Sequence, residues 1–180
     1  MIGLGFYTRG KNVELVIRAI GCTVPPRPEL VWVGNVADAG LLERSTALAQ
    51  GVAFRPLTRI GDDELVGLLN HAAAMVYAPR LEPFGLAPIE AAACGLPLVA
   101  VAEGDVRETV IDGVTSLLVG SDPAAIAAWP ASCLTRRSRD SWVRTGYTSP
   151  RLTRLGEASP TRRISDSMAQ PRGGPPCRSR

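Results

Sequence analysis

Short apolar runs alternate with longer amphipathic segments through the first 129 residues. The apolar runs have the length of β-strands and fall at 2–6, 30–34, 52–56, 74–79, 97–102 and 116–120. Helix-like segments lie between or after them, at 12–20, 39–50, 62–72, 84–94, 106–111 and 122–129. The runs are continuously apolar, which is typical of parallel strands covered by helices on both faces. We therefore predict an α/β fold, a doubly wound parallel sheet of five or six strands.

Charge and composition change abruptly after residue 129. Residues 1–129 carry nine basic and fourteen acidic side chains, whereas residues 130–180 carry eleven arginines and three acidic side chains. Large aliphatic side chains are scarce in that second part, below the density typical of folded domains. We predict one domain over 1–129 and a disordered tail, rich in Arg, Ser, Pro and Gly, over 130–180. Such a tail is typical either of a solvated interaction segment or of a shifted reading frame in G+C-rich coding sequence.

The spacing of the cysteines and the lengths of the apolar runs indicate in which cellular compartment the protein works. Cys22, Cys94, Cys133 and Cys177 form no C-x-x-C pair and lie far apart, which disfavours a disulfide framework or a metal cluster. No charged segment precedes a long apolar one, and no apolar run approaches the length of a membrane span. The sequence predicts a cytoplasmic protein without a membrane span.

One motif carries most of the chemical information. Residues 82–90 read Glu-Pro-Phe-Gly-Leu-Ala-Pro-Ile-Glu and directly follow the predicted strand 74–79. Phe84 and Gly85 should therefore lie where the carboxyl end of a strand meets a helix, the usual ligand position in open α/β sheets. Unpaired N–H groups and the positive end of the helix dipole favour an anion there, most plausibly a phosphate. Glu90 falls about two turns into the same helix.

This motif, followed by Ala-x-x-x-Gly-x-Pro at 91–97, resembles the group 1 glycosyltransferases of the GT-B fold. The segment Gly-Phe-Tyr-Thr-Arg-Gly-Lys at 5–11 looks like the donor loop of that family, and the resemblance covers about 3–128. It implies a Rossmann-like domain, the C-terminal half of a GT-B fold, which holds a nucleotide-diphospho-sugar as donor substrate. We expect the preceding half, which would bind the acceptor, to be absent from this chain.

The resemblance also implies roles for individual residues. Lys11 would bind the donor diphosphate, and Glu82 would lie beside the transferred sugar. These two are therefore the predicted catalytic residues. The predicted donor-binding residues are Gly5, Arg9, Lys11, Phe84, Gly85, Leu86 and Glu90, with Glu90 on the ribose hydroxyls. The chain departs from the family at Phe6, where an arginine normally assists the lysine. Arg9 is the nearby candidate to replace it.

These residue types suit the breaking of a bond between a sugar and a diphosphate. Fixed cations and N–H dipoles that face the departing diphosphate lower the barrier without a metal. The resemblance implies retaining, metal-independent hexosyl transfer that needs no cofactor beyond the donor. The only acidic cluster, 62–64, suits the first turn of a helix, so we predict no metal site.

Other functional classes stay open. The chain could be a nucleotide-sugar-binding remnant without turnover, or an isomerase that acts on nucleotide sugars. Nucleic-acid binding through the basic tail is a less favoured alternative, because Trp142 and Tyr147 offer stacking but no recognisable module surrounds them. In each case we expect the isolated chain to transfer no sugar by itself. The residues leave the base, the sugar and the acceptor open.

Overall fold

Six parallel strands form the centre of the protein. The computed structural model describes residues 1–80, 82, 84–113 and 116–129, so the predicted disordered tail lies outside the described residues. The strands are β1 (Ile2–Leu4), β2 (Leu30–Val33), β3 (Phe54–Leu57), β4 (Met75–Tyr77), β5 (Leu98–Val101) and β6 (Ser116–Val119). Their order across the sheet is β3-β2-β1-β4-β5-β6, and every neighbouring pair is parallel. The doubly wound α/β prediction is confirmed.

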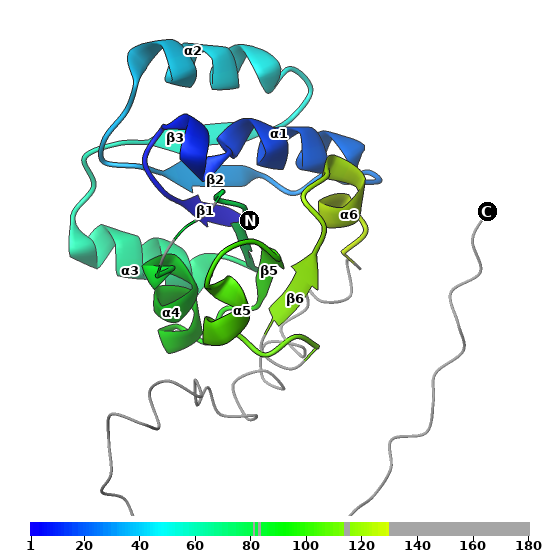
Figure 1. The fold of residues 1–180 in the computed structure, drawn as a ribbon. Coiled ribbons are helices and arrows are strands. Elements are labelled where there is room, and N and C mark those ends of the chain that lie inside the picture. Colours follow the sequence, from blue (N-terminus) through cyan, green and yellow to red (C-terminus); the bar gives the residue numbers. More distant parts are fainter. Residues whose placement is uncertain (81, 83, 114–115, 130–180) are drawn as a thin grey trace, which may run out of the picture.

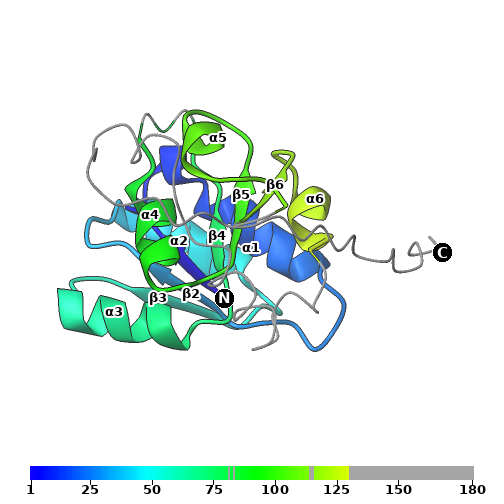
Figure 2. The same ribbon diagram turned by 90° about the horizontal axis from the view of Figure 1, so that it is seen from below.

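Helices cover both faces of this sheet (Figure 1). One face carries α1 (Val13–Cys22), α2 (Ala39–Leu48) and α6 (Pro123–Ala127), and the other carries α3 (Asp62–His71), α4 (Leu86–Ala93) and α5 (Val106–Thr109). Figure 2 shows from below how α4 lies over the strands. A short 3-10 helix, η1 (Arg9–Lys11), precedes α1. The sequence did not predict η1, because three polar or glycine residues show no apolar periodicity.

The strands are apolar throughout because they bury side chains on both faces. Trp32, Val76 and Val99 pack in the layer under α1, α2 and α6, whereas Met75 and Leu98 pack in the layer under α3, α4 and α5. Successive strand residues point to opposite faces, so each strand supplies both layers. Within the described residues, no helix is both long and apolar enough to cross a bilayer.

The strand order reverses its direction between β1 and β4. From β1 the chain winds outward through β2 to β3, then returns to β4 and winds the opposite way through β5 to β6. Neighbouring strands β1 and β4 therefore send their following loops to opposite faces. In doubly wound sheets this reversal opens a ligand-binding crevice outside the carboxyl ends of the strands.

Candidate active site

The loop after β1 is fixed by hydrogen bonds to β2 and its following residues. The Trp32 indole Nε1 donates to the Gly5 carbonyl at 2.8 Å, and the Gly5 N–H donates to the Val33 carbonyl at 2.9 Å. The buried Tyr7 hydroxyl donates to the Trp32 carbonyl at 2.8 Å. Gly34 permits this approach, because a Cβ there would lie 2.4 Å from the Gly5 carbonyl oxygen. The first site loop is thus rigidly held before any ligand binds.

An ion pair joins this loop to the loop after β4. Lys11 ends η1, and its Nζ donates to Oε2 of Glu82, which lies 71 positions further along the chain. The two side chains are 23% and 28% exposed, so the pair lies at the partly exposed surface rather than in the core. A Cβ on Gly5 would lie 2.9 Å from Lys11 Cδ, so the glycine leaves room for the lysine stem. The structure brings together the two residues predicted to be catalytic.

The backbone of Glu82 is held by the loop after β5. A Cβ on Gly104 would lie 2.7 Å from the Glu82 carbonyl oxygen, and the Asp105 N–H donates to that oxygen at 3.4 Å. Gly104 has a φ of 65°, which a glycine adopts without strain. The loops that follow β1, β4 and β5 therefore together position the Glu82 carboxylate at the carboxyl ends of the strands.

The start of α4 leaves backbone donors available. Gly85 precedes the helix with a φ of 63°, and no side chain of the described residues caps the first turn. Pro88 has no N–H, so the donors at this end come from Leu86 and Ala87. The side chains of Phe84 and Leu86 are 57% and 62% exposed. This arrangement suits the predicted backbone role of the Phe-Gly-Leu segment, which stays a prediction.

Tyr77 is a residue of this site that the sequence reasoning missed. It ends β4, it is 3% exposed, and its hydroxyl has no hydrogen-bond partner among the described residues. A Cβ on Gly85 would lie 3.1 Å from that hydroxyl oxygen. Burial raises the pKa of Tyr77, and the negative charge of Glu82 raises it further. A neutral hydroxyl without a partner among the described residues therefore lies beneath the turn after β4. The sequence signal that could have found it is a tyrosine at the end of an apolar strand, directly before the motif.

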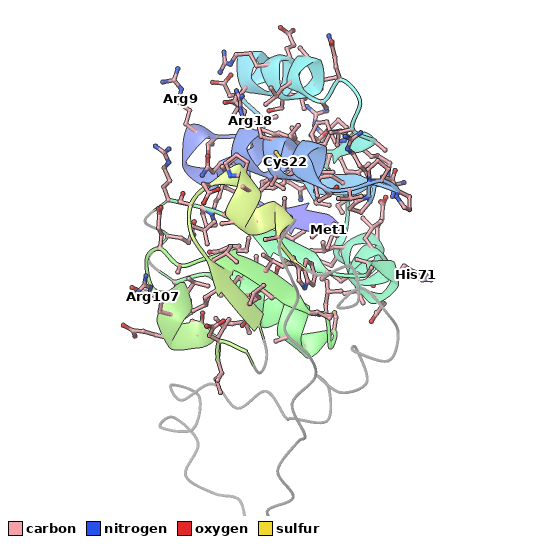
Figure 3. All side chains as sticks on the ribbon, turned by 90° about the vertical axis from the view of Figure 1, so that its right-hand side faces the viewer. Met1, Arg9, Arg18, Cys22, His71 and Arg107 are labelled. Atoms are coloured by element: carbon pink, nitrogen blue, oxygen red, sulfur yellow. The ribbon has the colours of Figure 1, made fainter. Side chains whose placement is uncertain are left out.

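Two predicted donor-binding residues stand apart from the Lys11–Glu82 pair. Arg9 lines a different pocket, and it projects outward from η1 (Figure 3). A 3-10 helix has three residues per turn, so positions 9 and 11 diverge by about 120° around η1. Glu90 is exposed on α4, about one turn from the helix start instead of the expected two, because the helix begins at Leu86. In the described part of the chain it has no ion pair with Lys11. Phe6 is 50% exposed at the position expected to hold an arginine.

The acidic and histidine side chains serve local structure. Asp62, Asp63 and Glu64 occupy the first turn of α3, where the helix dipole stabilises carboxylates. His71 ends that helix, and its Nδ1–H donates to the Gly67 carbonyl at 2.7 Å. Among the described residues, no three His, Cys, Asp or Glu side chains come close enough to hold a metal ion.

Most of the chain matches a known protein family. The family model described as "Glycosyl transferases group 1" matches residues 1–135. The chain belongs to the group 1 glycosyltransferases. Among its relatives, the D-inositol 3-phosphate glycosyltransferase of Streptomyces coelicolor is 35% identical over 132 residues. That match covers 65% of this chain and 28% of the relative, so the chain spans less than a third of that protein's length.

Solved structures of other proteins share the fold of this chain. The C-terminal domain of a group 1 family glycosyltransferase (LpcC) from Francisella tularensis superposes with a TM-score of 0.68 at 23% identity and covers 81% of both chains. The Anabaena protein HepE, solved in complex with UDP and glucose, superposes with a TM-score of 0.64 at 23% identity. That match covers 79% of this chain and 40% of HepE. The GT-B half-domain fold of this group 1 glycosyltransferase is confirmed.

Proposed function

We propose that this domain binds a nucleotide-diphospho-sugar and presents its hexosyl group for transfer. The observation that carries the proposal is the Lys11–Glu82 ion pair, placed at the carboxyl ends of β1 and β4 where the winding of the sheet reverses. A cation, a carboxylate and the uncapped start of α4 converge at this edge. Together they match the parts of a glycosyl diphosphate, which carries negative charge next to a sugar with hydroxyl groups.

Lys11 is the proposed partner of the diphosphate. In the ligand-free protein its ammonium is paired with Glu82, so a bound diphosphate would take over a cation that is already positioned. Negative charge grows on the leaving diphosphate as the anomeric bond breaks, and a fixed ammonium stabilises that charge more in the transition state than before it. The N–H groups of Leu86 and Ala87 at the start of α4 are placed to add to this stabilisation. This chemistry needs no metal ion.

Glu82 and Glu90 are the proposed contacts to hydroxyl groups. Once Lys11 turns to the diphosphate, the Glu82 carboxylate becomes an acceptor for hydroxyl groups of the transferred sugar. Glu90 is exposed on α4, about one turn beyond the helix start, which leaves its carboxylate available for the ribose. We further propose that transfer retains the anomeric configuration and that the acceptor carries a phosphate, as the name of the Streptomyces coelicolor relative indicates for that protein.

Calorimetric titration of the 180-residue chain with UDP, GDP, ADP and the matching nucleosides tests the donor site. A hydrogen bond to a charged group contributes roughly 1.5–3 kcal/mol, so Lys11→Ala should weaken the preferred nucleoside diphosphate about ten- to a hundred-fold. Binding of the nucleoside should change little, because it lacks the phosphates. Glu90→Gln should weaken the nucleoside and its diphosphate by the same factor.

Glu82→Gln is the matched control for Lys11→Ala. Both substitutions break the same ion pair, but the glutamine variant leaves the cation free for phosphate. We expect Glu82→Gln to bind the nucleoside diphosphate at least as tightly as the wild-type chain. Equal losses in both variants would show that the pair only holds the two loops together, and they would refute the phosphate role of Lys11.

A binding remnant without turnover is the second candidate, and Phe6 favours it. The apolar ring replaces a cation expected beside Lys11, and the Arg9 side chain lines another pocket. Phe6→Arg should then tighten nucleoside diphosphate binding by restoring the missing charge. Unchanged affinity in this variant would count against a defect at position 6.

A further inference from the structure

The Tyr77 hydroxyl is a buried polar group that the ligand-free site leaves unused. Tyr77 ends β4, and its side chain packs in the apolar layer under α3, α4 and α5. The residue is 3% exposed, and its hydroxyl has no hydrogen-bond partner among the described residues. A buried hydroxyl without a partner destabilises the folded state, whereas a phenylalanine would fill the same space without that cost. The hydroxyl therefore has a donor to offer in another state of the site.

The surroundings of this hydroxyl point to the Glu82 carboxylate as its partner in that state. The hydroxyl oxygen lies under the turn before α4, where a Cβ on Gly85 would be 3.1 Å away. Burial raises the pKa of Tyr77, and the negative charge of Glu82 raises it further, so the carboxylate lies within electrostatic reach of the hydroxyl. A tyrosine that keeps its proton at neutral pH can donate one hydrogen bond to a carboxylate oxygen.

Lys11 occupies this carboxylate in the ligand-free protein. Its Nζ donates to Oε2 of Glu82, and within the described residues the Glu82 carboxylate has no other ion-pair or hydrogen-bond partner. A diphosphate that takes the ammonium would therefore leave a carboxylate without its cation, on a side chain that is only 28% exposed. Partly buried charge without a partner is unfavourable, so a second donor for Glu82 would favour the bound state.

We propose that Tyr77 is a positioning residue whose hydroxyl donates a hydrogen bond to Glu82 when the donor diphosphate takes Lys11. The proposal rests on the proposed function, because it names what holds Glu82 after its lysine is engaged. One carboxylate oxygen accepts from Tyr77, and the other stays available for a hydroxyl group of the sugar. Tyr77 is too deeply buried to touch the donor, so it acts through Glu82.

Thermal melting of the full chain tests the hydroxyl without any ligand. Lys11→Met keeps most of the side-chain length and removes the charge, so it reproduces the state in which Glu82 has lost its cation. Tyr77→Phe should raise the melting temperature of the wild-type chain by about 2–4 °C and lower that of Lys11→Met by a similar amount. A rise or no change in Lys11→Met would overturn the proposal, and so would equal shifts in both backgrounds.

Two further variants identify the acceptor of the hydroxyl. Tyr7→Phe is the matched control, because the Tyr7 hydroxyl is equally buried but donates to the Trp32 carbonyl. It should lower the melting temperature by the same amount with and without Lys11→Met. When Glu82→Ala is added to Lys11→Met, the carboxylate is gone, so Tyr77→Phe should again raise the melting temperature. A fall that persists in this variant would show that another group accepts from Tyr77, and it would overturn the pairing with Glu82.

Calorimetric titration with UDP and with inorganic pyrophosphate connects the hydroxyl to the diphosphate. Tyr77→Phe should weaken both ligands about tenfold, because the variant cannot hold Glu82 once Lys11 is taken. Uridine lacks phosphates and should bind Tyr77→Phe as it binds the wild-type chain. In a Glu82→Ala background Tyr77→Phe should have no effect on either phosphate ligand, and a persisting tenfold loss would mean direct contact and overturn the positioning role. Failure of both phosphate ligands to bind the wild-type chain would count against the proposed function, whereas the melting temperatures judge the hydroxyl by themselves.

Discussion

The two loops that meet at the Lys11–Glu82 ion pair differ in how completely the buried polar groups around them are hydrogen-bonded. Around residues 5–7 of the loop after β1, the Tyr7 hydroxyl and the Trp32 indole both have carbonyl acceptors. In the turn after β4, the Tyr77 hydroxyl is equally buried but has no partner among the described residues. The same turn exposes the large apolar side chains of Phe84 and Leu86.

The difference teaches which part of the site is ready before a ligand arrives. A segment such as 5–7, whose surrounding buried donors have acceptors, gains nothing further by moving, so it acts as a fixed wall. A turn with an unpartnered hydroxyl and uncapped N–H groups has hydrogen-bonding capacity left over for a guest. We infer that the β1 loop positions Lys11 in advance and that the β4 turn adjusts around the sugar and phosphates.

Added methyl groups should break the fixed wall more severely than the adjustable turn. In Gly34→Ala the new Cβ would meet a backbone oxygen at 2.4 Å, so we expect a loss of about 3 kcal/mol or more in the free energy of unfolding. In Gly85→Ala the contact is the end of a tyrosine side chain at 3.1 Å, and the positive φ adds about 1–2 kcal/mol. Urea unfolding measures both.

Gly67→Ala is the control for these two glycine variants. This glycine lies inside α3, where an added Cβ meets nothing within 4 Å, so alanine should stabilise the protein by about 0.5–1 kcal/mol. A Gly34→Ala loss no larger than that of Gly85→Ala would show that the β1 loop is not the more rigid of the two.

Alkaline pH should show how tightly the folded protein holds the proton of the buried Tyr7 hydroxyl. Burial raises the pKa of Tyr7 to about 12, above the value near 10 of an unfolded tyrosine. The folded state then holds its proton more tightly, so the contribution is complete below pH 10 and is lost as the pH rises through 12. That loss is about 2–3 kcal/mol for Tyr7. Urea unfolding between pH 9 and 12 should show a shallower pH dependence in Tyr7→Phe, and an unchanged slope would contradict the buried hydroxyl.

Removal of the hydroxyl groups at neutral pH should give small effects of opposite sign. Tyr7→Phe loses a hydrogen bond and leaves the Trp32 carbonyl without it, which costs about 1 kcal/mol. Tyr77→Phe removes a buried group that has no partner among the described residues, so it should stabilise the ligand-free protein by about 1 kcal/mol. Thermal melting resolves the difference. Destabilisation of both variants to the same extent would mean that the two tyrosines are in equivalent surroundings.

Much of the fold follows from the sequence because burial on two faces leaves a direct trace. The six apolar runs correspond to the six strands, with ends that differ by at most two residues. The β3 prediction began two residues too early, because Val52 and Ala53 extend the apolar run although the strand begins at Phe54. Capping residues such as Asp38, which accepts from the Leu41 N–H at 2.9 Å, mark helix starts that sequence patterns can find.

Only part of the candidate site could be predicted from the sequence, because contacts between loops of different strands leave no local sequence pattern. The glycine-centred motif located Glu82 and the start of α4, but the pairing with Lys11 depends on the strand order. Tyr77 looks like an ordinary strand residue until its hydroxyl is found without a partner. The pocket around Arg9 joins positions 9, 44 and 80, which no spacing rule connects.

One hydrogen bond between the two loops has a thermodynamic consequence. The Arg80 N–H donates to the Gly10 carbonyl at 2.8 Å, so one backbone hydrogen bond ties the β4 loop to η1. Gly10 directly precedes Lys11, the residue proposed to hold the donor diphosphate. If the donor shifts η1, this bond carries the shift to the β4 loop, and reciprocity requires that the loop arrangement favoured by the donor binds the donor more tightly by the same factor. Occupancy of one loop would then be reported to the other through a single peptide group.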